Sequence, residues 1–422
     1  MINKLKSIVY NKELLWTILF QLVKMIGGMI LIKLLATFLN KEEYGYYALI
    51  MSISSFILML PFTAFQQAVS RYTSIYYHRK DYNVFLTSII FIFTICIIMY
   101  IILFSILYIT VFDELSIWGN LSFLIILFII SEIYKILFRS INNANRKRKN
   151  IAISSILEFF IKIGIILYTH IYLDLNIAYV LFALSIGNFI SLVVMYKQNI
   201  NFIRFTSINI KKLKLIFLRI WMFSYPLLIW APFGWFRDMS NRWYLDYFTN
   251  KETVALFALI SSISLIIPTI LQSFANSFFI PILYQKENKQ KGYIRIYLRY
   301  MVSIGILFIL FIFIISLFFK KEIILLISDE KYLSVAWMFP YMFLAYGLYM
   351  LSMMSNVEIF AHKNTKKLIY ASSIPGVISI VCGYFFISYY GLVGAFYNYI
   401  ITYSSYAFLT FYVVFHYKGR IK

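Results

Sequence analysis

The strongest constraint on the fold is an internal repeat. Residues 40–54, Asn-Lys-Glu-Glu-Tyr-Gly-Tyr-Tyr-Ala-Leu-Ile-Met-Ser-Ile-Ser, recur as residues 250–264, Asn-Lys-Glu-Thr-Val-Ala-Leu-Phe-Ala-Leu-Ile-Ser-Ser-Ile-Ser. Nine of the fifteen positions are identical without a gap, and the offset of 210 residues is almost half of the 422-residue chain. Because loop positions match as well as apolar ones, we interpret the repeat as a duplication, which implies a fold of two related halves.

The composition places both halves in a membrane. Hydrophobic residues make up 62% of the chain and charged residues only 13%, whereas a soluble domain is about one quarter charged. Apolar runs of about 20 residues, long enough to cross a bilayer, recur from end to end. We therefore predict an all-α integral membrane protein with about twelve transmembrane helices. Their expected ranges are 14–39, 44–69, 84–112, 118–140, 151–172, 175–196, 215–247, 252–279, 297–319, 334–357, 368–388 and 391–416.

The distribution of positive charge predicts the orientation of these helices. The segments between them alternate in character, so that 28 Lys and Arg lie on one side, counting both termini, five on the other side and six within spans. Positive residues flank the cytoplasmic ends of spans, so both termini are predicted to be cytoplasmic. Six spans per half give two parallel six-helix bundles, residues 1–208 and 209–422, related by a pseudo-twofold axis along the membrane normal. The net charge of +22 is then a topology signal and an attraction to anionic membrane lipids, and we predict no nucleic-acid partner.

Sequence motifs of common enzymes are absent. The chain has no Gly-x-x-x-x-Gly-Lys-Ser/Thr phosphate loop, no His-Glu-x-x-His and no Gly-x-Ser-x-Gly. Its two cysteines, Cys96 and Cys382, lie in apolar runs, and its four histidines lie at helix ends or in loops. We therefore predict no catalytic residue, no metal site and no cofactor.

Charged residues inside the first predicted helix are candidates for function, because a charge in the bilayer is costly unless it faces a cavity or a partner. Lys24 lies about 15 Å from the cytoplasmic end of this helix. It shares one face with Thr17, Gln21 and Gly28. Lys33, nine residues further on, lies on the opposite face, where it can snorkel to the interface or reach the cavity. We predict that Lys24 and Gln21 contact an anionic substrate.

The seventh predicted helix contains Arg237, Asp238 and Arg242. The repeat aligns them with the middle of the first helix, so we place them within the span. Asp238 and Arg242 are four residues apart and are expected to pair, which leaves Arg237 as the unpaired cation. The alternative is that the pair only anchors the outer end of the helix. Pro226 and Pro232 are expected to kink this helix, as is tolerated where a helix lines a cavity.

A second group of charges is predicted on the fourth and fifth helices. Glu132, Lys135 and Arg139 share one helical face, and Glu158 and Lys162 share another. The two helices are antiparallel neighbours, so Glu132 can pair with Lys162, or Glu158 with Lys135. We favour a structural network of ion pairs. The alternative is a carboxylate that couples transport to a proton or sodium gradient, a role also open to Asp238.

Three amides complete the set of candidate residues. Gln66 and Asn276 are equivalent under the repeat, and Gln272 lies one turn before Asn276. They can bond sugar hydroxyls or join neighbouring helices, and the sequence leaves both readings open.

Several of these segments resemble a known family. Leu34–Leu39 followed by Glu43–Leu49, then Ser224–Leu228 ahead of Arg237-Asp238, and later Gly391–Phe396, resemble in order and spacing the polysaccharide branch of the multidrug/oligosaccharidyl-lipid/polysaccharide (MOP) exporter superfamily. That branch contains the Wzx-type translocases of O-antigen repeat units. One departure is Val254-Ala255, where the family usually has a Gly in the second copy.

The resemblance implies a fold similar to that of the MATE exporters and a specific function. The implied activity is a flippase for an undecaprenyl-pyrophosphate-linked oligosaccharide, in lipopolysaccharide or capsule synthesis, at the bacterial inner membrane. The implied partners are a polysaccharide polymerase and a chain-length regulator. The buried cations Lys24, Arg237 and Arg242 suit a pyrophosphate, and alternating access would move it across.

Two other functions are less consistent with the sequence than a flippase is. A multidrug exporter of the same superfamily should have an acidic cavity, but the spans hold six basic residues against three acidic ones. A membrane glycan polymerase or ligase resembles families with a long periplasmic loop rich in Arg and His, and the outer loops here are short.

Overall fold

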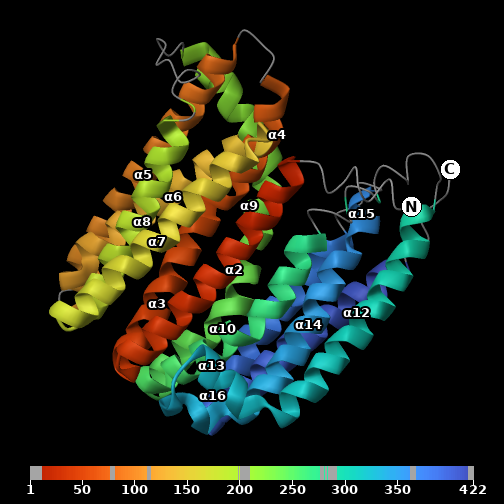
Figure 1. Ribbon diagram of the computed structural model, residues 1–422. Coiled ribbons are helices and arrows are strands. Elements are labelled where there is room, and N and C mark those ends of the chain that lie inside the picture. The colour runs from red at the N-terminus through yellow and green to blue at the C-terminus, as the bar shows by residue number, and fades with distance from the viewer. Residues whose placement is uncertain are drawn as a thin grey trace. The chain divides into compact units, whose positions relative to one another are not determined.

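The computed structural model describes residues 12–76, 81–111, 116–197, 199, 210–275, 280, 283, 292–361 and 367–416, and every regular element in these ranges is a helix (Figure 1). Ten of the helices are long and apolar enough to cross a membrane, and α9 (Ile210–Phe248), which breaks between Ile229 and Ala231, makes an eleventh span. That break falls between Pro226 and Pro232, the two prolines expected to kink this helix. The chain is a multi-pass membrane protein.

The helix bounds follow the apolar runs closely. The N-terminal helices are α2 (Lys12–Phe38), α3 (Lys41–Ile57), α4 (Ala64–Tyr76), α5 (Tyr82–Val111), α6 (Ser116–Ala144), α7 (Arg148–Tyr172) and α8 (Ile177–Lys197). After α9 come α10 (Lys251–Phe274), α12 (Tyr293–Phe318), α13 (Lys320–Ile327), α14 (Phe339–Ser355), α15 (Val357–Ala361) and α16 (Lys367–Phe415). Two irregular turns join them, a π-helix η1 (Leu58–Thr63) and a 3-10 helix η3 (Glu330–Met338).

The long element α16 is a helical hairpin. Its run is interrupted at Gly391, whose φ of 54° and ψ of −125° are not helical. Asn398, beyond the break, donates a hydrogen bond of 3.1 Å from Nδ2 to the carbonyl of Ser379, before it. The separate helices predicted at 368–388 and 391–416 are therefore present, and with them the described residues contain the twelve spans expected.

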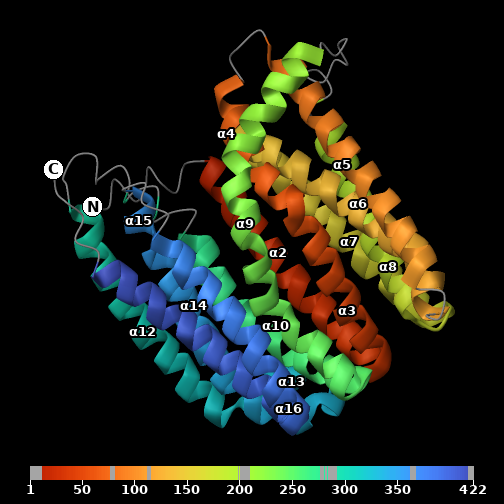
Figure 2. The same ribbon diagram turned by 180° about the vertical axis from the view of Figure 1, so that it is seen from behind.

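The described residues form two compact units. Unit 1 comprises Met1–Gly28 and Ile50–Ala231, and unit 2 comprises Met29–Leu49 and Pro232–Lys422. In unit 1, α8 packs against both α6 and α7, and α4 packs against α5 and α6. In unit 2, α14 is the central helix, with α10, α12 and α16 against it (Figure 2). Each unit is thus a helical bundle with its own core.

The sequence repeat has a structural counterpart within unit 2 and at its border. Asn40 Oδ1 accepts a hydrogen bond of 2.7 Å from the backbone N–H of Glu43, and Asn250 Oδ1 accepts one of 2.9 Å from that of Thr253. Both asparagines therefore cap the N-terminus of the following helix, a position that favours this residue type. Five further identical pairs are buried in both copies: Leu35 and Leu245, Ala48 and Ala258, Leu49 and Leu259, Ile50 and Ile260, Ser54 and Ser264.

The N-terminal ends of the two repeat helices, α3 and α10, also touch each other, at Gly45. A Cβ added to Gly45 would collide with the backbone carbonyl of Lys251, which cannot rotate away as a side chain can. We expect Gly45→Ala to lower the free energy of unfolding by roughly 1–3 kcal/mol, as overpacking does. The matched change Gly164→Ala in α7, where no atom lies within 4 Å, should instead be neutral or stabilising by up to about 1 kcal/mol. Thermal unfolding of both variants in the same detergent tests whether the two changes in stability have opposite signs.

The second predicted helix, 44–69, is not continuous. Pro61 lies inside η1, and Leu60 before it has the extended angles φ −120° and ψ 114°. Proline lacks an N–H and clashes with the preceding turn, which frees backbone carbonyls. Near the break, Thr63 Oγ1 donates to the carbonyl of Leu58 at 2.9 Å, and the hydroxyl of Tyr100 donates to that of Leu60. These side chains therefore provide hydrogen-bond donors for backbone carbonyls at the break inside the span.

Residues 320–331, expected to be a plain connection, instead form α13 and the start of η3. This segment is tied to the end of α2 by two lysines in opposite directions. Lys33 donates to the carbonyls of Leu325 (2.5 Å) and Ser328, at the C-terminus of α13. Lys331 donates to the carbonyl of Leu39 (2.5 Å), at the C-terminus of α2. A cation at a helix C-terminus is favourable, so Lys33 has a structural role and is not a free cation.

Candidate functional site

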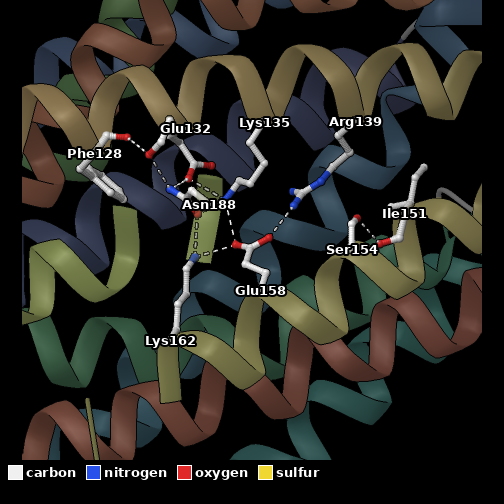
Figure 3. Close-up of polar contacts among 10 residues, drawn as sticks. Phe128, Glu132, Lys135, Arg139, Ile151, Ser154, Glu158, Lys162 and Asn188 are labelled. Carbon is white, nitrogen blue, oxygen red and sulfur yellow. Dashed lines mark hydrogen bonds and ion pairs between the residues drawn. The ribbon is translucent and has the colours of Figure 1, made fainter. Parts of the chain in front are cut away.

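The largest buried charge network lies in unit 1, where α6, α7 and α8 meet (Figure 3). Glu158 Oε1 accepts from Lys162 at 2.6 Å and from Lys135 at 2.9 Å, while its Oε2 faces Arg139 at 3.4 Å. Glu132 pairs with Lys135 at 2.6 Å. The predicted pairing of Glu158 with Lys135 is present, whereas Glu132 pairs with Lys135 on its own helix.

Asn188 on α8 joins the carboxylate of Glu132 to the two lysines. Its Oδ1 accepts from Lys135 at 2.7 Å and from Lys162 at 2.8 Å, and its Nδ2 donates to Glu132 at 2.7 Å. Its side chain is fully buried. The preceding residue, Gly187, makes room for this arrangement, because a Cβ there would lie 2.5 Å from Cγ of Lys162. Asn188 was not among the predicted residues, although an amide in the middle of an apolar span was a usable signal.

The charges of this network do not cancel. Glu132 and Glu158 balance Lys135 and Lys162, so Arg139 is in excess by one positive charge. Arg139 is also the most exposed of the three cations, at 25% of its side chain against 5% for Lys135 and 7% for Lys162. The network therefore presents positive charge on the side of Arg139.

Lys24 adds to that positive charge. It lies in α2 within electrostatic range of Lys135 and Arg139, and of the two carboxylates. Lys24 is exposed, and no hydrogen-bond or ion-pair partner for it occurs in the described part of the chain. A cation on a membrane span is costly in contact with lipid, so we expect this side of unit 1 to face water or an anion. Gln21, one turn earlier, is half-buried.

In unit 2 the predicted ion pair of the seventh helix is wrong. Asp238 pairs with its neighbour Arg237 through two contacts, Nε to Oδ1 at 2.8 Å and Nη2 to Oδ2 at 3.1 Å. The guanidinium also lies over the rings of Tyr349 (4.7 Å), Tyr406 (5.1 Å) and Tyr403 (5.9 Å). The Tyr403 hydroxyl donates to Asp238 at 2.8 Å. Arg237 is therefore neutralised and enclosed, with only 9% of its side chain exposed.

Arg242 is the unpaired cation instead. Its Nη1 donates to the carbonyl of Ala48 at 3.1 Å. Its Nε is buried without a hydrogen-bond partner among the described residues. It has no carboxylate within ion-pair distance in the part of unit 2 that the structure describes. The sequence thus identified the helix that holds a free cation but assigned the wrong arginine.

Comparison with known proteins adds a family. The profile of the family described as "Polysaccharide biosynthesis protein" matches residues 11–287, which is most of the chain. This chain belongs to that polysaccharide biosynthesis family. A search among curated proteins finds no match.

Solved structures show the fold of this polysaccharide biosynthesis family member. The structure titled "Lipid II flippase MurJ, inward closed conformation" superposes with a TM-score of 0.72 at 16% identity, over 94% of this chain and 87% of that one. An inward-facing multidrug resistance MATE family transporter of the MOP superfamily gives 0.67 at 13% identity, over 94% and 93%. The Vibrio cholerae MATE transporter VcmN, in its bent form, gives 0.62 at 12% identity, over 94% of each chain. The predicted MOP-type fold is confirmed by these structures, and the predicted membership of a polysaccharide biosynthesis family is confirmed by the family match.

Of the predicted amides, Gln66 belongs to unit 1 and Gln272 to unit 2. Gln66 is half-buried, and its backbone carbonyl accepts from Ser140 at 3.2 Å. Gln272 points its Nε2 at the sulfur of Met353, at 3.8 Å. Asn276 lies outside the described residues.

A different amide pair, not predicted, is buried in unit 2. Asn398 donates to Asn241 Oδ1, and both are buried. Ser240 and Ser379 hydroxyls meet beside them at 2.9 Å. Because these polar groups bond one another across α9 and α16, they join these helices in the way expected of intramembrane amides. In the described ranges, no group of three or more His, Cys, Asp or Glu side chains could hold a metal ion.

Proposed function

We propose that this chain is a flippase for an undecaprenyl-pyrophosphate-linked oligosaccharide. In this proposal it moves the repeat unit from the cytoplasmic to the periplasmic leaflet of the bacterial inner membrane by alternating access between its two units. Membership of a polysaccharide biosynthesis family and a fold shared with a protein titled as a lipid flippase support this class of substrate. A polysaccharide polymerase and a chain-length regulator, in O-antigen or capsule synthesis, are the partners it would work with.

The observation that carries the proposal is the presence of one uncompensated cation in each of two repeat-related helices. Lys24 of α2 lies beside a network that already has a positive excess, and Arg242 of α9 has a buried Nε without a partner among the described residues. A pyrophosphate offers several anionic oxygens, which an ammonium binds as a point charge and a guanidinium binds with two N–H groups. We assign a direct contact to Lys24 in unit 1 and another to Arg242 in unit 2, and to Arg237 the role of fixing Asp238 within α9.

Coupling to a proton or sodium gradient is a separate proposal. Glu158 pairs with three cationic groups, and Asp238 accepts two hydrogen bonds from Arg237 and one from Tyr403. Glu132 is more exposed than Glu158, at 18% against 4%, and accepts from one lysine and one amide. Glu132 is therefore the carboxylate to test first, by measuring transport with Glu132→Gln across imposed ion gradients.

The same superfamily offers a second function, export of small molecules, because two of the similar structures are multidrug or MATE transporters. Cationic drugs would be repelled by the positive excess near Lys24. We therefore rank this function second, and transport of a cationic dye by the purified protein in vesicles would support it.

The leaflet in which lipid-linked sugars accumulate tests the proposal. In a strain that lacks this gene but retains its glycan polymerase, we expect single repeat units on undecaprenyl pyrophosphate to build up on the cytoplasmic face. The wild-type gene should reverse the build-up. Single units on the periplasmic face would mean that flipping still occurs and that the chain acts later, as a polymerase would. No build-up on either face would refute the proposed substrate.

A further inference from the structure

The N-terminal half of α2 presents one face to basic residues of α6 and α7. Glu13, Trp16, Phe20 and Lys24 are spaced by three and four residues, so they lie on the same side of the helix. Gly27 continues this face and lies against the ring of Phe159 in α7. All of these residues belong to unit 1. The face is therefore a fixed feature of one compact unit.

A basic side chain lies opposite each of the first three positions on this face. Arg148 Nε is 3.7 Å from Glu13 Oε1. Lys149 Nζ is 5.9 Å from the ring centre of Trp16. Arg139 Cζ is 5.7 Å from the ring centre of Phe20. Together with Lys24 these side chains form a row of four cations, Arg148, Lys149, Arg139 and Lys24, which begins at the α6–α7 connection.

The row keeps its positive charge because aromatic rings hold two of its members. A ring face attracts a cation through its quadrupole but carries no net charge, so the ring itself does not neutralise the cation. Among the described residues only one carboxylate, Glu13, pairs with the row at its start, and Arg139 has only the 3.4 Å contact to Glu158, whose other oxygen is shared by two lysines. Lys149 also lies in the first turn of α7, where the helix dipole adds positive potential.

All four cations of the row are at least partly exposed. Lys149 and Lys24 are exposed, and Arg139 and Arg148 keep 25% and 31% of their side chains exposed. The positions on α2 that these cations face are three or four residues apart, which is about 5 Å along the helix axis. An anion with two phosphate groups can therefore contact two neighbouring cations at once.

We propose that this basic row guides the diphosphate of a lipid-linked substrate from the predicted cytoplasmic end of α2 to Lys24, with Trp16 and Phe20 as positioning residues for Lys149 and Arg139. The inference rests on the proposed function and specifies the route of its head group. The chemistry recognised is a diphosphate on a lipid. Phosphate groups of ordinary membrane phospholipids share part of that chemistry, so the test separates the two sources.

The test measures binding of geranylgeranyl diphosphate to the full chain in nanodiscs of phosphatidylcholine. We expect the double variant Arg139→Gln, Lys149→Gln to bind it roughly tenfold or more weakly, because each lost charged hydrogen bond weakens binding by about that factor. Arg139→Gln should still fold, since the remaining two carboxylates and two lysines of the network balance. The charge-keeping variant Arg139→Lys, Lys149→Arg should retain most of the binding and guards against a loss due to misfolding.

Two further variants and one change of lipid make the result decisive. Lys212→Gln removes an exposed cation of α9 that pairs with Asp81 outside the row, and it should leave binding unchanged. Trp16→Leu with Phe20→Leu should raise the apparent Kd and the KM for flipping, with a smaller effect on the maximal rate. Adding phosphatidylglycerol to the nanodiscs should not displace the diphosphate, and displacement would assign the row to leaflet phospholipids and overturn the proposal.

Wild-type affinity in the Arg139→Gln, Lys149→Gln variant would also overturn the route, while leaving the flippase intact if the deletion strain still accumulates cytoplasmic-face repeat units. Failure of the proposed function has a different signature. In that case the wild-type protein would bind no prenyl diphosphate and the deletion strain would accumulate no lipid-linked sugar.

Discussion

Replacing Glu158 by Gln is expected to lower the free energy of unfolding by roughly 3–5 kcal/mol, the cost of breaking a buried ion pair from one side. The carboxylate of Glu158 is the shared partner of Lys135, Lys162 and Arg139, and only 4% of its side chain is exposed. A glutamine keeps the shape of the side chain but leaves these cations facing one another with a single remaining carboxylate, Glu132. The loss should appear as a lower unfolding temperature and faster proteolysis in detergent.

Two companion variants show whether the charge balance is the cause. Glu132→Gln should cost less than Glu158→Gln, because Glu132 is 18% exposed and Lys135 keeps its contact with Glu158. The double variant Glu158→Gln, Lys162→Met should recover part of the stability lost in Glu158→Gln, since it removes one of the stranded cations. If Glu158→Gln instead folds like the wild type and only changes the dependence of transport on an ion gradient, Glu158 is a coupling residue and the network is not primarily structural.

Most of the fold was readable from the sequence because it depends on long apolar runs and on a repeat. Asn40 and Asn250 match in the sequence, and in the structure both cap a helix. The break at Pro61 was missed because a proline in a span can be accommodated without a break, and only the tertiary contacts of η1 decide the outcome.

Residue spacing predicted an ion pair of the candidate site correctly in unit 1 and incorrectly in unit 2. In unit 1 the spacing of Glu158 and Lys162 placed both on one helical face, and the structure pairs them. In unit 2 the same rule of four-residue spacing favoured Asp238 with Arg242, because adjacent residues on a helix do not face each other. The rings of Tyr349 and Tyr406, which come from elements far along the chain, hold the Arg237 guanidinium so that it reaches Asp238. No pattern among neighbouring residues in the sequence predicts that packing.

Replacing Lys24 by Gln is expected to reduce flipping per folded molecule by roughly 10- to 100-fold, the effect of losing one or two charged hydrogen bonds to the substrate. Lys24→Arg should keep most of the activity, because the cation remains. The measurement is the amount of cytoplasmic-face repeat unit in the deletion strain complemented with each variant, normalised to folded protein in the membrane. Full rescue by Lys24→Gln would show that Lys24 does not contact the substrate.

Lys33→Gln in the same helix is the matched control. Lys33 bonds the carbonyls of Leu325 and Ser328, so its loss should lower stability by about 1.5–3 kcal/mol without a specific loss of flipping.

Lys24→Gln and Lys33→Gln should therefore differ in their effect on stability as well as in their effect on flipping. Lys24 lies near Arg139, Lys135 and the two carboxylates of a network whose net charge is positive, and it has no hydrogen-bond or ion-pair partner in the described residues. Removing its charge should therefore relieve net repulsion and leave stability unchanged or slightly raised. A residue whose removal stabilises the protein while it abolishes activity is retained for function at the expense of stability. A substrate that brings two negative charges to this position would offset that cost only while it is bound, which is what a transporter requires of a site that must also release its cargo.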